Sequence, residues 1–509
     1  MWIKILQLLL GAVAIYVLYF RWSRRKLFAV AARMEGPMDL PLIGCGYLFL
    51  GKSSPRAIGE TLTKLFTRFR APFAAWLGPY LVVVINKPEH CKALLNSNDN
   101  LERAHFYRFF DMENALLVCS GDKWRPKRKA LNMSFTPVIV NKFVPIINEK
   151  SRKLLAALDD FVGGPERDIV MELCKFTLDN IFSTILPCHF DIRTSAEGQN
   201  YLVKAQSYLP LVTKRFFHAH HYSDFVYNRS KDGANFYEAR NVVRSVSRSV
   251  LHTKAADDKL NPTLSEPLPA VGTNSKARGF LDILCSLARE GLHSMDGQAL
   301  LDHLDEIIYT GFETSAVNIG HMLLMLAMHQ DIQERVYQEV ITVCPNPEAD
   351  VTLEDINNLV YTEMAIKETL RLFPVISLFG RTLSVDLKID DEYTLPKGTQ
   401  VMISLQQMHR DPEIWGPNSN SFDPDHFLPD RAAERHPFAF LPFSAGPRNC
   451  IGYRYAWMLV RIVMAHLVRT YHFRTMLRMD QLDTSFSVLH KISNGCVVSI
   501  ERRKPCSQR

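Results

Sequence analysis

Residues 443–452 read Phe-Ser-Ala-Gly-Pro-Arg-Asn-Cys-Ile-Gly and stand immediately before a helical pattern from about residue 453 to 472. A cysteine placed here is suited to bind a metal as a thiolate, because the positive end of the helix dipole and nearby backbone N–H groups stabilise a sulfur anion. The glycines let the backbone approach a flat cofactor closely, and Arg448 can neutralise a carboxylate on that cofactor. For Cys450 taken alone, the alternative is a buried structural cysteine in a tight turn.

The whole stretch is more informative than its cysteine. Phe443, Gly446, Arg448, Cys450 and Gly452 fit the haem-binding signature F-x-x-G-x-R-x-C-x-G without a mismatch. The chain therefore resembles the cytochromes P450, the haem-thiolate monooxygenases. The resemblance implies that haem b is the cofactor and that Cys450 is the axial ligand of its iron. It also implies a mostly α fold with a small β portion, forming a single haem domain.

The composition fits one large globular unit. Of the 509 residues, 47% are hydrophobic, which supports a large core, and 60 basic against 53 acidic residues give a net charge of +7. This charge is too mild to imply a nucleic-acid partner. The ten cysteines are scattered without a Cys-x-x-Cys pair, as expected of reduced thiols facing the cytosol.

The N-terminus predicts a single transmembrane anchor. Residues 5–20 are apolar except for Gln7, and from Trp2 the stretch is just long enough to span a thin bilayer. Basic residues crowd residues 21–26, whereas only Lys4 precedes the stretch, and this asymmetry places the downstream side in the cytosol. A cleaved secretory signal is the alternative, but the charges lie on the wrong side of the apolar run. With the resemblance, this predicts an endoplasmic reticulum membrane protein whose catalytic domain faces the cytosol.

The expected organisation has four parts. Residues 1–20 form the anchor, residues 21–50 a basic and proline-rich linker, residues 51–503 the haem-thiolate monooxygenase domain, and residues 504–509 a C-terminal tail. Three prolines among polar residues from 252 to 279 predict a long surface loop inside the domain.

A second motif lies near residue 124. Trp124 and Arg128 match the family element W-x-x-x-R, which contacts the haem propionates, and Arg381 resembles a further propionate contact. Arginine suits this role because its planar fork pairs with carboxylates and stays charged when partly buried. A solvated basic helix end is the alternative for this string alone.

One long helix is predicted from Asp296 to about His329. A glycine inside a helix costs about 1 kcal/mol relative to alanine, so Gly311 indicates the close approach of a ligand or another backbone. Gly311, Glu313 and Thr314 resemble the family's oxygen-activation motif, in which Thr314 and Glu313 would relay protons. The alternative is a helix that bends where its hydroxyls bond back to its own carbonyls. The motif departs from many family-4 members, in which a glutamate that esterifies the haem precedes the glycine, whereas here Thr310 stands there.

Glu368 and Arg371 form an E-x-x-R element. Residues three apart share one helix face, so the two side chains can form a buried ion pair that fixes local geometry. The family's usual third partner is an arginine, and here His426 stands in its place, which predicts a weaker and pH-sensitive triad.

Two regions outside these motifs are relevant to the substrate and the branch of the family. Residues 436–442, His-Pro-Phe-Ala-Phe-Leu-Pro, lead into the haem loop as in family-4-type sequences, insect members among them. The aromatic residues around His218, His220 and His221 are expected to roof an apolar cavity that dips into the membrane, and a metal site there is disfavoured because carboxylate or cysteine companions are missing. The residues expected to line that cavity are Phe106, Phe109, Phe110, Leu116, Leu117, Tyr208, Leu209, Leu211, Phe216, Phe217, Tyr222 and Phe225.

The chain contains neither a dinucleotide fingerprint nor a flavin-type segment, so electrons must come from another polypeptide. The resemblance implies NADPH–cytochrome P450 reductase, with cytochrome b5 as a further candidate, and O2 and a lipophilic small molecule as substrates. Lys127, Lys129, Arg454 and Arg461 are expected to form a basic face for the donor.

Two other functions share a haem thiolate. An isomerase or dehydratase would need neither reductase nor O2, and a haem sensor or carrier would not need the Glu313–Thr314 pair. The acid–alcohol pair therefore favours the monooxygenase.

Overall fold

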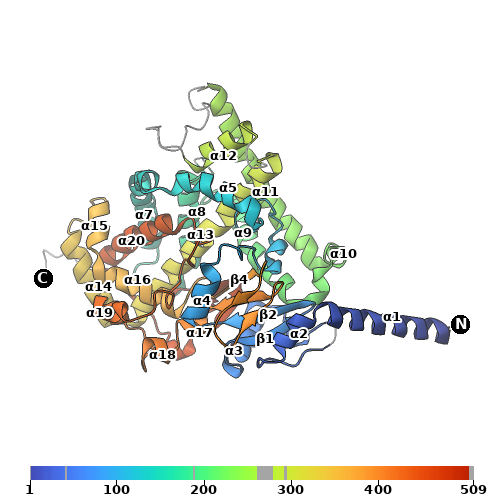
Figure 1. The fold of residues 1–509 in the computed structure, drawn as a ribbon. Coiled ribbons are helices and arrows are strands. Elements are labelled where there is room, and N and C mark those ends of the chain that lie inside the picture. The colour runs from blue at the N-terminus through green and yellow to red at the C-terminus, as the bar shows by residue number, and fades with distance from the viewer. Residues whose placement is uncertain are drawn as a thin grey trace.

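The computed structural model describes residues 2–40, 43–186, 188, 190–260, 279–291 and 295–503. Most of them lie in helices (Figure 1). The α-helices are α1 (Trp2–Ser23), α2 (Arg25–Ala31), α3 (Pro55–Arg68), α4 (Pro88–Leu95), α5 (Gly121–Leu131), α6 (Pro137–Val140), α7 (Val144–Asp159), α8 (Val170–Thr184), α9 (Ala196–Phe217), α10 (Asp224–Tyr227), α11 (Lys231–Leu260), α12 (Phe280–Arg289), α13 (Gly297–Met328), α14 (Gln330–Val343), α15 (Leu353–Asn358), α16 (Val360–Leu372), α17 (Leu405–Met408), α18 (Pro412–Trp415), α19 (Pro429–Ala433) and α20 (Tyr453–Thr470).

The β portion is small. Its strands are β1 (Phe73–Leu77), β2 (Tyr80–Ile85), β3 (Arg167–Asp168), β4 (Leu378–Thr382), β5 (Leu387–Lys388), β6 (Thr394–Leu395), β7 (Gln400–Ser404), β8 (Tyr471–Arg474), β9 (Thr484–Ser487), β10 (Leu489–Ile492) and β11 (Val497–Arg502). The predicted fold class, mostly α with a small β portion, is confirmed.

Helix α13 forms the centre of the main hydrophobic core. Its N-terminus is capped by Asp296, whose Oδ1 accepts the Ala299 N–H at 2.7 Å. Helices α8, α11, α16 and α20 pack around it, and most of its side chains are buried. A helix that is surrounded in this way needs apolar residues on nearly every face, as the sequence of α13 provides. The helix predicted from Asp296 to about His329 is therefore present.

The largest sheet has the order β1-β2-β7-β4. Strands β1 and β2 are antiparallel, β2 runs parallel to β7 with Val83 opposite Val401, and β4 is antiparallel to β7 with Arg381 opposite Val401. A second apolar core that includes Val83, Val401 and Ile403 covers one side of this sheet. The register places Arg381 beside the main cavity described below.

Helix α1 projects away from the body of the molecule (Figure 1). It is long and apolar enough to cross a membrane, and its large side chains, such as Trp2 and Leu8, are exposed. At its end the chain returns to the protein, because Phe20 is buried and Phe28 of α2 stacks on Trp76 of β1 with ring centroids 4.4 Å apart. Part of the segment predicted as a linker is thus a helix packed on the sheet.

The loop predicted at residues 252–279 is partly wrong, because α11 continues to Leu260. The start of the segment, His-Thr-Lys-Ala-Ala-Asp-Asp-Lys-Leu, has no proline or glycine, and its lysines, alanines and leucine extend the helix. The rest of the predicted loop, residues 261–278, and the predicted tail, residues 504–509, lie outside the described residues.

Candidate active site

The loop before α20 is held in one conformation by its own backbone. Gly446 has φ +70°, and a Cβ there would lie 2.0 Å from the carbonyl oxygen of Leu95, so only glycine fits. The Cys450 N–H donates to the Phe443 carbonyl at 3.0 Å, which closes the turn. Gly452 then caps α20, so the cysteine stands just before the helix N-terminus, as predicted.

Cys450 faces an internal cavity of about 400 Å³. Burial inside the protein raises the pKa of its thiol, whereas a backbone hydrogen bond from Gly452 and the charge of Arg128 lower it. Burial is the largest of these effects, so the pKa of the thiol lies above its ordinary value in the protein alone. A cation bound above the sulfur would stabilise the thiolate.

The cavity extends from Cys450 to α13 and on to the β9–β10 hairpin, whose residues Val488 and Leu489 line it. Most of its wall is apolar. Helix α13 contributes Glu306, Ile307, Tyr309, Thr310, Gly311, Thr314, Ser315 and Asn318 to it. The aromatic and leucine residues that line it as predicted are Phe106, Phe110, Leu116, Leu117, Leu209, Phe216 and Phe217. Five of the predicted lining residues are not in its wall, namely Phe109, Tyr208, Leu211, Tyr222 and Phe225.

Four arginines converge beside this cavity. Arg103, Arg128 and Arg448 line it, and Arg381 of β4 is buried next to them. Within the described residues none of the four guanidinium groups pairs with a carboxylate. Arg448 donates to the backbone carbonyls of Leu116 and Cys119. The hydrogen bonds of the other three arginines go to backbone carbonyls and asparagine side chains.

This arrangement leaves positive charge in excess. Burial and neighbouring arginines lower the pKa of Arg448 to about 9 and hold the pKa of Arg381 well below its usual range. Buried charges need partners, so the cluster calls for a ligand that carries more than one carboxylate. The two propionates of haem b meet this need, and Trp124, which is buried under the Arg448 guanidinium at 4.7 Å, completes the cluster.

Gly452 supports the same cofactor. A Cβ at this position would meet no atom within 4 Å, and its φ of −87° is open to any residue, so the protein itself gives no reason for a glycine. Gly452 lines the cavity, where a flat ring lying on the loop would fill that space. The residues present therefore fit haem b.

Gly311 has a cause in addition to the one predicted. A Cβ on Gly311 would lie 2.6 Å from Cδ1 of Ile181 on α8, so the close approach comes from a neighbouring side chain as well as from the cavity. Thr314 Oγ1 donates to the carbonyl of Thr310 at 2.7 Å, and Ser315 Oγ donates to that of Gly311 at 2.9 Å. The local bonds named as the structural alternative are thus present.

Glu313 does not line the cavity. Its carboxylate is buried and forms an ion pair with Lys491 of β10, whose ammonium group is partly exposed. Burial raises the pKa of Glu313, and Lys491 lowers it. The sequence analysis did not identify Lys491, because it lies 178 residues away and belongs to no motif.

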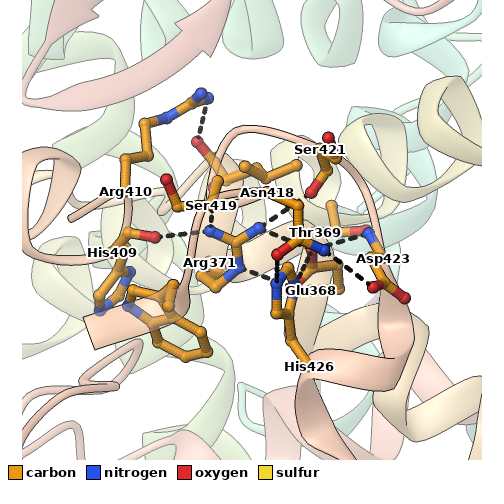
Figure 2. A network of polar contacts seen from close by, with 12 residues as sticks. Glu368, Thr369, Arg371, His409, Arg410, Asn418, Ser419, Ser421, Asp423 and His426 are labelled. Carbon is orange, nitrogen blue, oxygen red and sulfur yellow. Dashed lines mark hydrogen bonds and ion pairs between the residues drawn. The ribbon is translucent and has the colours of Figure 1, made fainter. Parts of the chain in front are cut away.

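The E-x-x-R element forms a buried network (Figure 2). Arg371 binds Glu368 with two bonds of 2.7 Å, from Nε to Oε2 and from Nη2 to Oε1. His426 Nδ1 lies 3.0 Å from Glu368 Oε1, so the histidine takes the third position as predicted. Arg371 Nη1 also donates to the carbonyl of His409 at 2.7 Å, and His409 Nε2 accepts the Leu441 N–H at 3.2 Å. The network thereby supports the chain just before the cysteine loop.

The predicted basic face is partly wrong. Lys127 is buried and donates to the Asn114 carbonyl at 2.9 Å, and Arg461 pairs with Glu363 at 3.2 Å. Lys129 and Arg454 are exposed. A helix places consecutive residues on different faces, which the prediction for the Lys127–Lys129 string ignored.

The comparisons with known proteins agree with this geometry. The family model for cytochrome P450 matches residues 34–496. Similar proteins from Drosophila melanogaster include probable cytochrome P450 313a4 (28% identity, over 97% of this chain and 98% of the relative) and probable cytochrome P450 313b1 (31%, over 97% and 99%). Cytochrome P450 4g1 is 28% identical over 98% of this chain and 94% of its own length, which confirms the resemblance to the family-4 branch.

The cysteine loop, the arginine cluster and the matched length lead to the same conclusion. The chain belongs to the cytochrome P450 family, the monooxygenases that bind haem b through a cysteine thiolate.

Proposed function

We propose that this protein inserts one atom of O2 into a lipophilic small molecule with electrons from NADPH. The observation that carries this proposal is the cavity that joins Cys450 to Thr314 and is walled mostly by apolar side chains. A fatty acid, a terpenoid or steroid hormone, a pheromone and a foreign compound all match such a wall. Haem b, when bound, supplies the oxygen activation that amino-acid side chains lack.

Most of the site residues hold the cofactor in this proposal. Cys450 would bind the iron, and Phe443, Gly452 and Gly311 would leave room for the ring. The cationic and aromatic residues Arg103, Trp124, Arg128, Arg381 and Arg448 would hold the propionates. The structure adds Arg103 to these residues, because it lines the cavity although it belongs to none of the sequence motifs.

Thr314 orients oxygen in the cavity. Its hydroxyl proton is engaged by the Thr310 carbonyl, so the lone pairs of Oγ1 are available to accept a hydrogen bond from a protonated oxygen atom. Glu313 lies behind the cavity wall, where burial raises the pKa of its carboxyl group and Lys491, which is partly exposed, pairs with it. Thr314 thus provides an acceptor at the cavity, and Glu313 with Lys491 provides a path for protons from the protein surface toward it.

The proposal includes the electron donors and the cellular location. NADPH–cytochrome P450 reductase supplies the electrons, with cytochrome b5 as a second donor, and residues 1–20 anchor the protein in the endoplasmic reticulum membrane with residues 51–503 in the cytosol. Residues 21–50 connect the two, and the basic residues Arg21, Arg24, Arg25 and Lys26 follow the anchor directly. Removal of residues 2–19 is expected to release the protein from membranes, with the haem spectrum retained.

Reconstitution with the reductase tests the function. NADPH oxidation that depends on both a lipophilic compound and O2, with a product that carries labelled oxygen from O2, is the expected result. Product formed without reductase would favour an isomerase or dehydratase, and saturable ligand binding without any product from a broad lipophilic panel would favour a sensor or carrier.

A further inference from the structure

The backbone of residues 114–119, which joins the 3-10 turn at residues 105–110 to α5, is held by charged side chains on two sides. Its N–H groups face carboxylates on α13. Asp302 Oδ2 accepts from Asn114 N and Nδ2 at 3.3 and 3.0 Å, and Glu306 accepts from Leu116 N at 2.9 Å and Leu117 N at 2.5 Å.

The carbonyl groups of the same segment face cations. Lys127 donates to the Asn114 carbonyl at 2.9 Å, Arg448 Nη1 to that of Leu116 at 3.2 Å, and Arg103 Nε to that of Leu117 at 3.1 Å. Hydrogen bonds to charged groups are about twice as strong as neutral ones. The segment is therefore fixed between the distal helix and the residues that hold the cofactor.

Glu306 is the member of this set that acts directly on the cavity wall. It lies one turn before Thr310, lines the cavity itself, and binds the two peptide groups whose side chains, Leu116 and Leu117, also line it. Oε2 accepts the Leu116 N–H and also lies 3.3 Å from Nδ1 of His303, and Oε1 accepts the Leu117 N–H. Neither peptide can therefore rotate without losing a charge-assisted bond.

We propose that Glu306 is a specificity-determining positioning residue, which holds Leu116 and Leu117 as a rigid wall and so limits the width of the substrates that the cavity accepts. The inference rests on the proposed function only in that the cavity takes a lipophilic substrate. Ligand binding and backbone exchange, which need no turnover, keep its test separate from that function.

The test compares Glu306→Gln with Asp305→Asn in the full-length, haem-loaded protein. Glutamine keeps the size of the side chain but presents an NH2 group to one of the two peptide N–H groups, so one bond is lost. Asp305 is a matched control, because its buried carboxylate on the same turn binds Arg244 at 2.7 Å and Ser247 at 2.6 Å on α11 and does not touch the segment.

For Glu306→Gln we expect hydrogen exchange at Leu116 and Leu117 to become about 10- to 100-fold faster. The wide ligands are bulky polycyclic imidazoles and the slim ones are linear alkyl imidazoles, and binding of both is measured from the spectral shift of the haem. Binding of the wide ligands, relative to that of the slim ones, is expected to strengthen about 10-fold. Asp305→Asn should change neither quantity. Glu306→Asp keeps the charge but has a shorter side chain, so it should change hydrogen exchange and ligand preference in the same direction by less. This variant replaces Glu306→Gln in the test if the glutamine variant does not fold.

Unchanged exchange at both leucines would overturn the inference. So would faster exchange without any change in the preference between slim and wide ligands, since Glu306 would then be only structural. Equal shifts in Glu306→Gln and Asp305→Asn would likewise overturn it, because the effect would then come from weakening α13 in general.

Discussion

Thr314 presents its oxygen atom to the cavity with the proton directed to the carbonyl of Thr310. If this oxygen steers protons during oxygen activation, Thr314→Ala should still bind haem, O2 and substrate but release a larger share of the electrons as hydrogen peroxide. We expect the product formed per NADPH to fall by at least about 10-fold, because loss of one positioned proton-transfer group slows its step by about 10²–10⁴-fold and lets peroxide release compete.

Thr314→Ser is the matched control, because it keeps the hydroxyl and removes only a methyl group. It should retain most of the coupling. Full coupling of product to NADPH in Thr314→Ala would show that the role assigned to this residue is wrong.

The third position of the E-x-x-R network is held by His426, where the family pattern has an arginine. Its imidazole contacts Glu368 at 3.0 Å and Asn418 at 3.2 Å, and all of these groups except Asn418 are buried. His426→Ala should lower the free energy of unfolding by about 1–3 kcal/mol, because Glu368 loses one of its partners. Urea unfolding followed by fluorescence measures this, with His252→Ala, an exposed histidine on α11, as the control. Equal stability of the two variants would contradict the assignment.

Single residues were predictable where a motif names them and not where a contact joins distant parts of the chain. Cys450, Trp124 and Arg128, which the motifs name as cofactor-binding residues, all line the cavity. Arg103 and Glu306 also lie there, but each is an ordinary charged residue in the sequence, and only the packing of α13 against residues 114–119 places it at the cavity.

At the scale of elements, the contact between α13 and α8 explains why a long helix contains Gly311. The Cβ of an alanine would lie 2.6 Å from Ile181 Cδ1. Alanine gains about 1 kcal/mol of helix propensity, whereas overpacking of a buried site costs about 1–3 kcal/mol. We expect Gly311→Ala to lose about 1 kcal/mol of stability on balance.

Shortening Ile181 should reduce the cost of Gly311→Ala. In an Ile181→Val background Cδ1 is gone and only Cγ1, at 3.2 Å, stays close to the new Cβ, so Gly311→Ala should cost about 1 kcal/mol less than in the wild-type protein. A double-mutant cycle of unfolding free energies measures the coupling between the two sites. Additive effects would mean that the glycine is required by the cavity alone.

Elements were easier to predict than their boundaries. The apolar pattern predicted α13 and α20, because both are long helices with many buried apolar side chains. The end of α11 was missed because prolines further along dominated the composition of residues 252–279. The segment of the linker that forms α2 was missed because Phe28 packs on Trp76, a contact with a residue that is remote in the sequence.

For the whole molecule, buried histidines predict how stability depends on pH. Burial lowers the pKa values of His321, His409 and His466 to about 3, so these side chains are neutral in the folded protein at pH 5–7. In the unfolded chain they bind protons below the ordinary pKa of about 6.5. The unfolded state therefore binds more protons in this window, and stability must rise with pH from about 3 to 6.5 and fall on acidification.

Each such histidine contributes a slope of up to about 1.4 kcal/mol per pH unit. We expect Tm to fall steadily as the pH is lowered from 7 to 5. Carboxylates such as Glu368 do not cause this fall, because Arg371 and His426 lower the pKa of Glu368 despite its burial and keep it ionised in this range. His466→Gln should flatten the slope and His252→Gln should not. A Tm that is constant from pH 7 to pH 5 would contradict this account.

The same histidines link stability to the cofactor site. Protonation of His409 would remove the acceptor for the Leu441 N–H, two residues before Phe443, and so loosen the support of the cysteine loop. Loss of haem on acidification should therefore accompany the fall in Tm and not precede it.

The central claim is that Cys450 binds the haem iron as a thiolate, and the spectrum of the reduced protein with carbon monoxide tests it most directly. The account predicts the strongly red-shifted Soret band typical of thiolate ligation in the wild-type protein and its loss in Cys450→Ala. The control, Cys119→Ala, removes a different cysteine and should keep the band. A full complement of haem without that band in the wild-type protein would contradict the account.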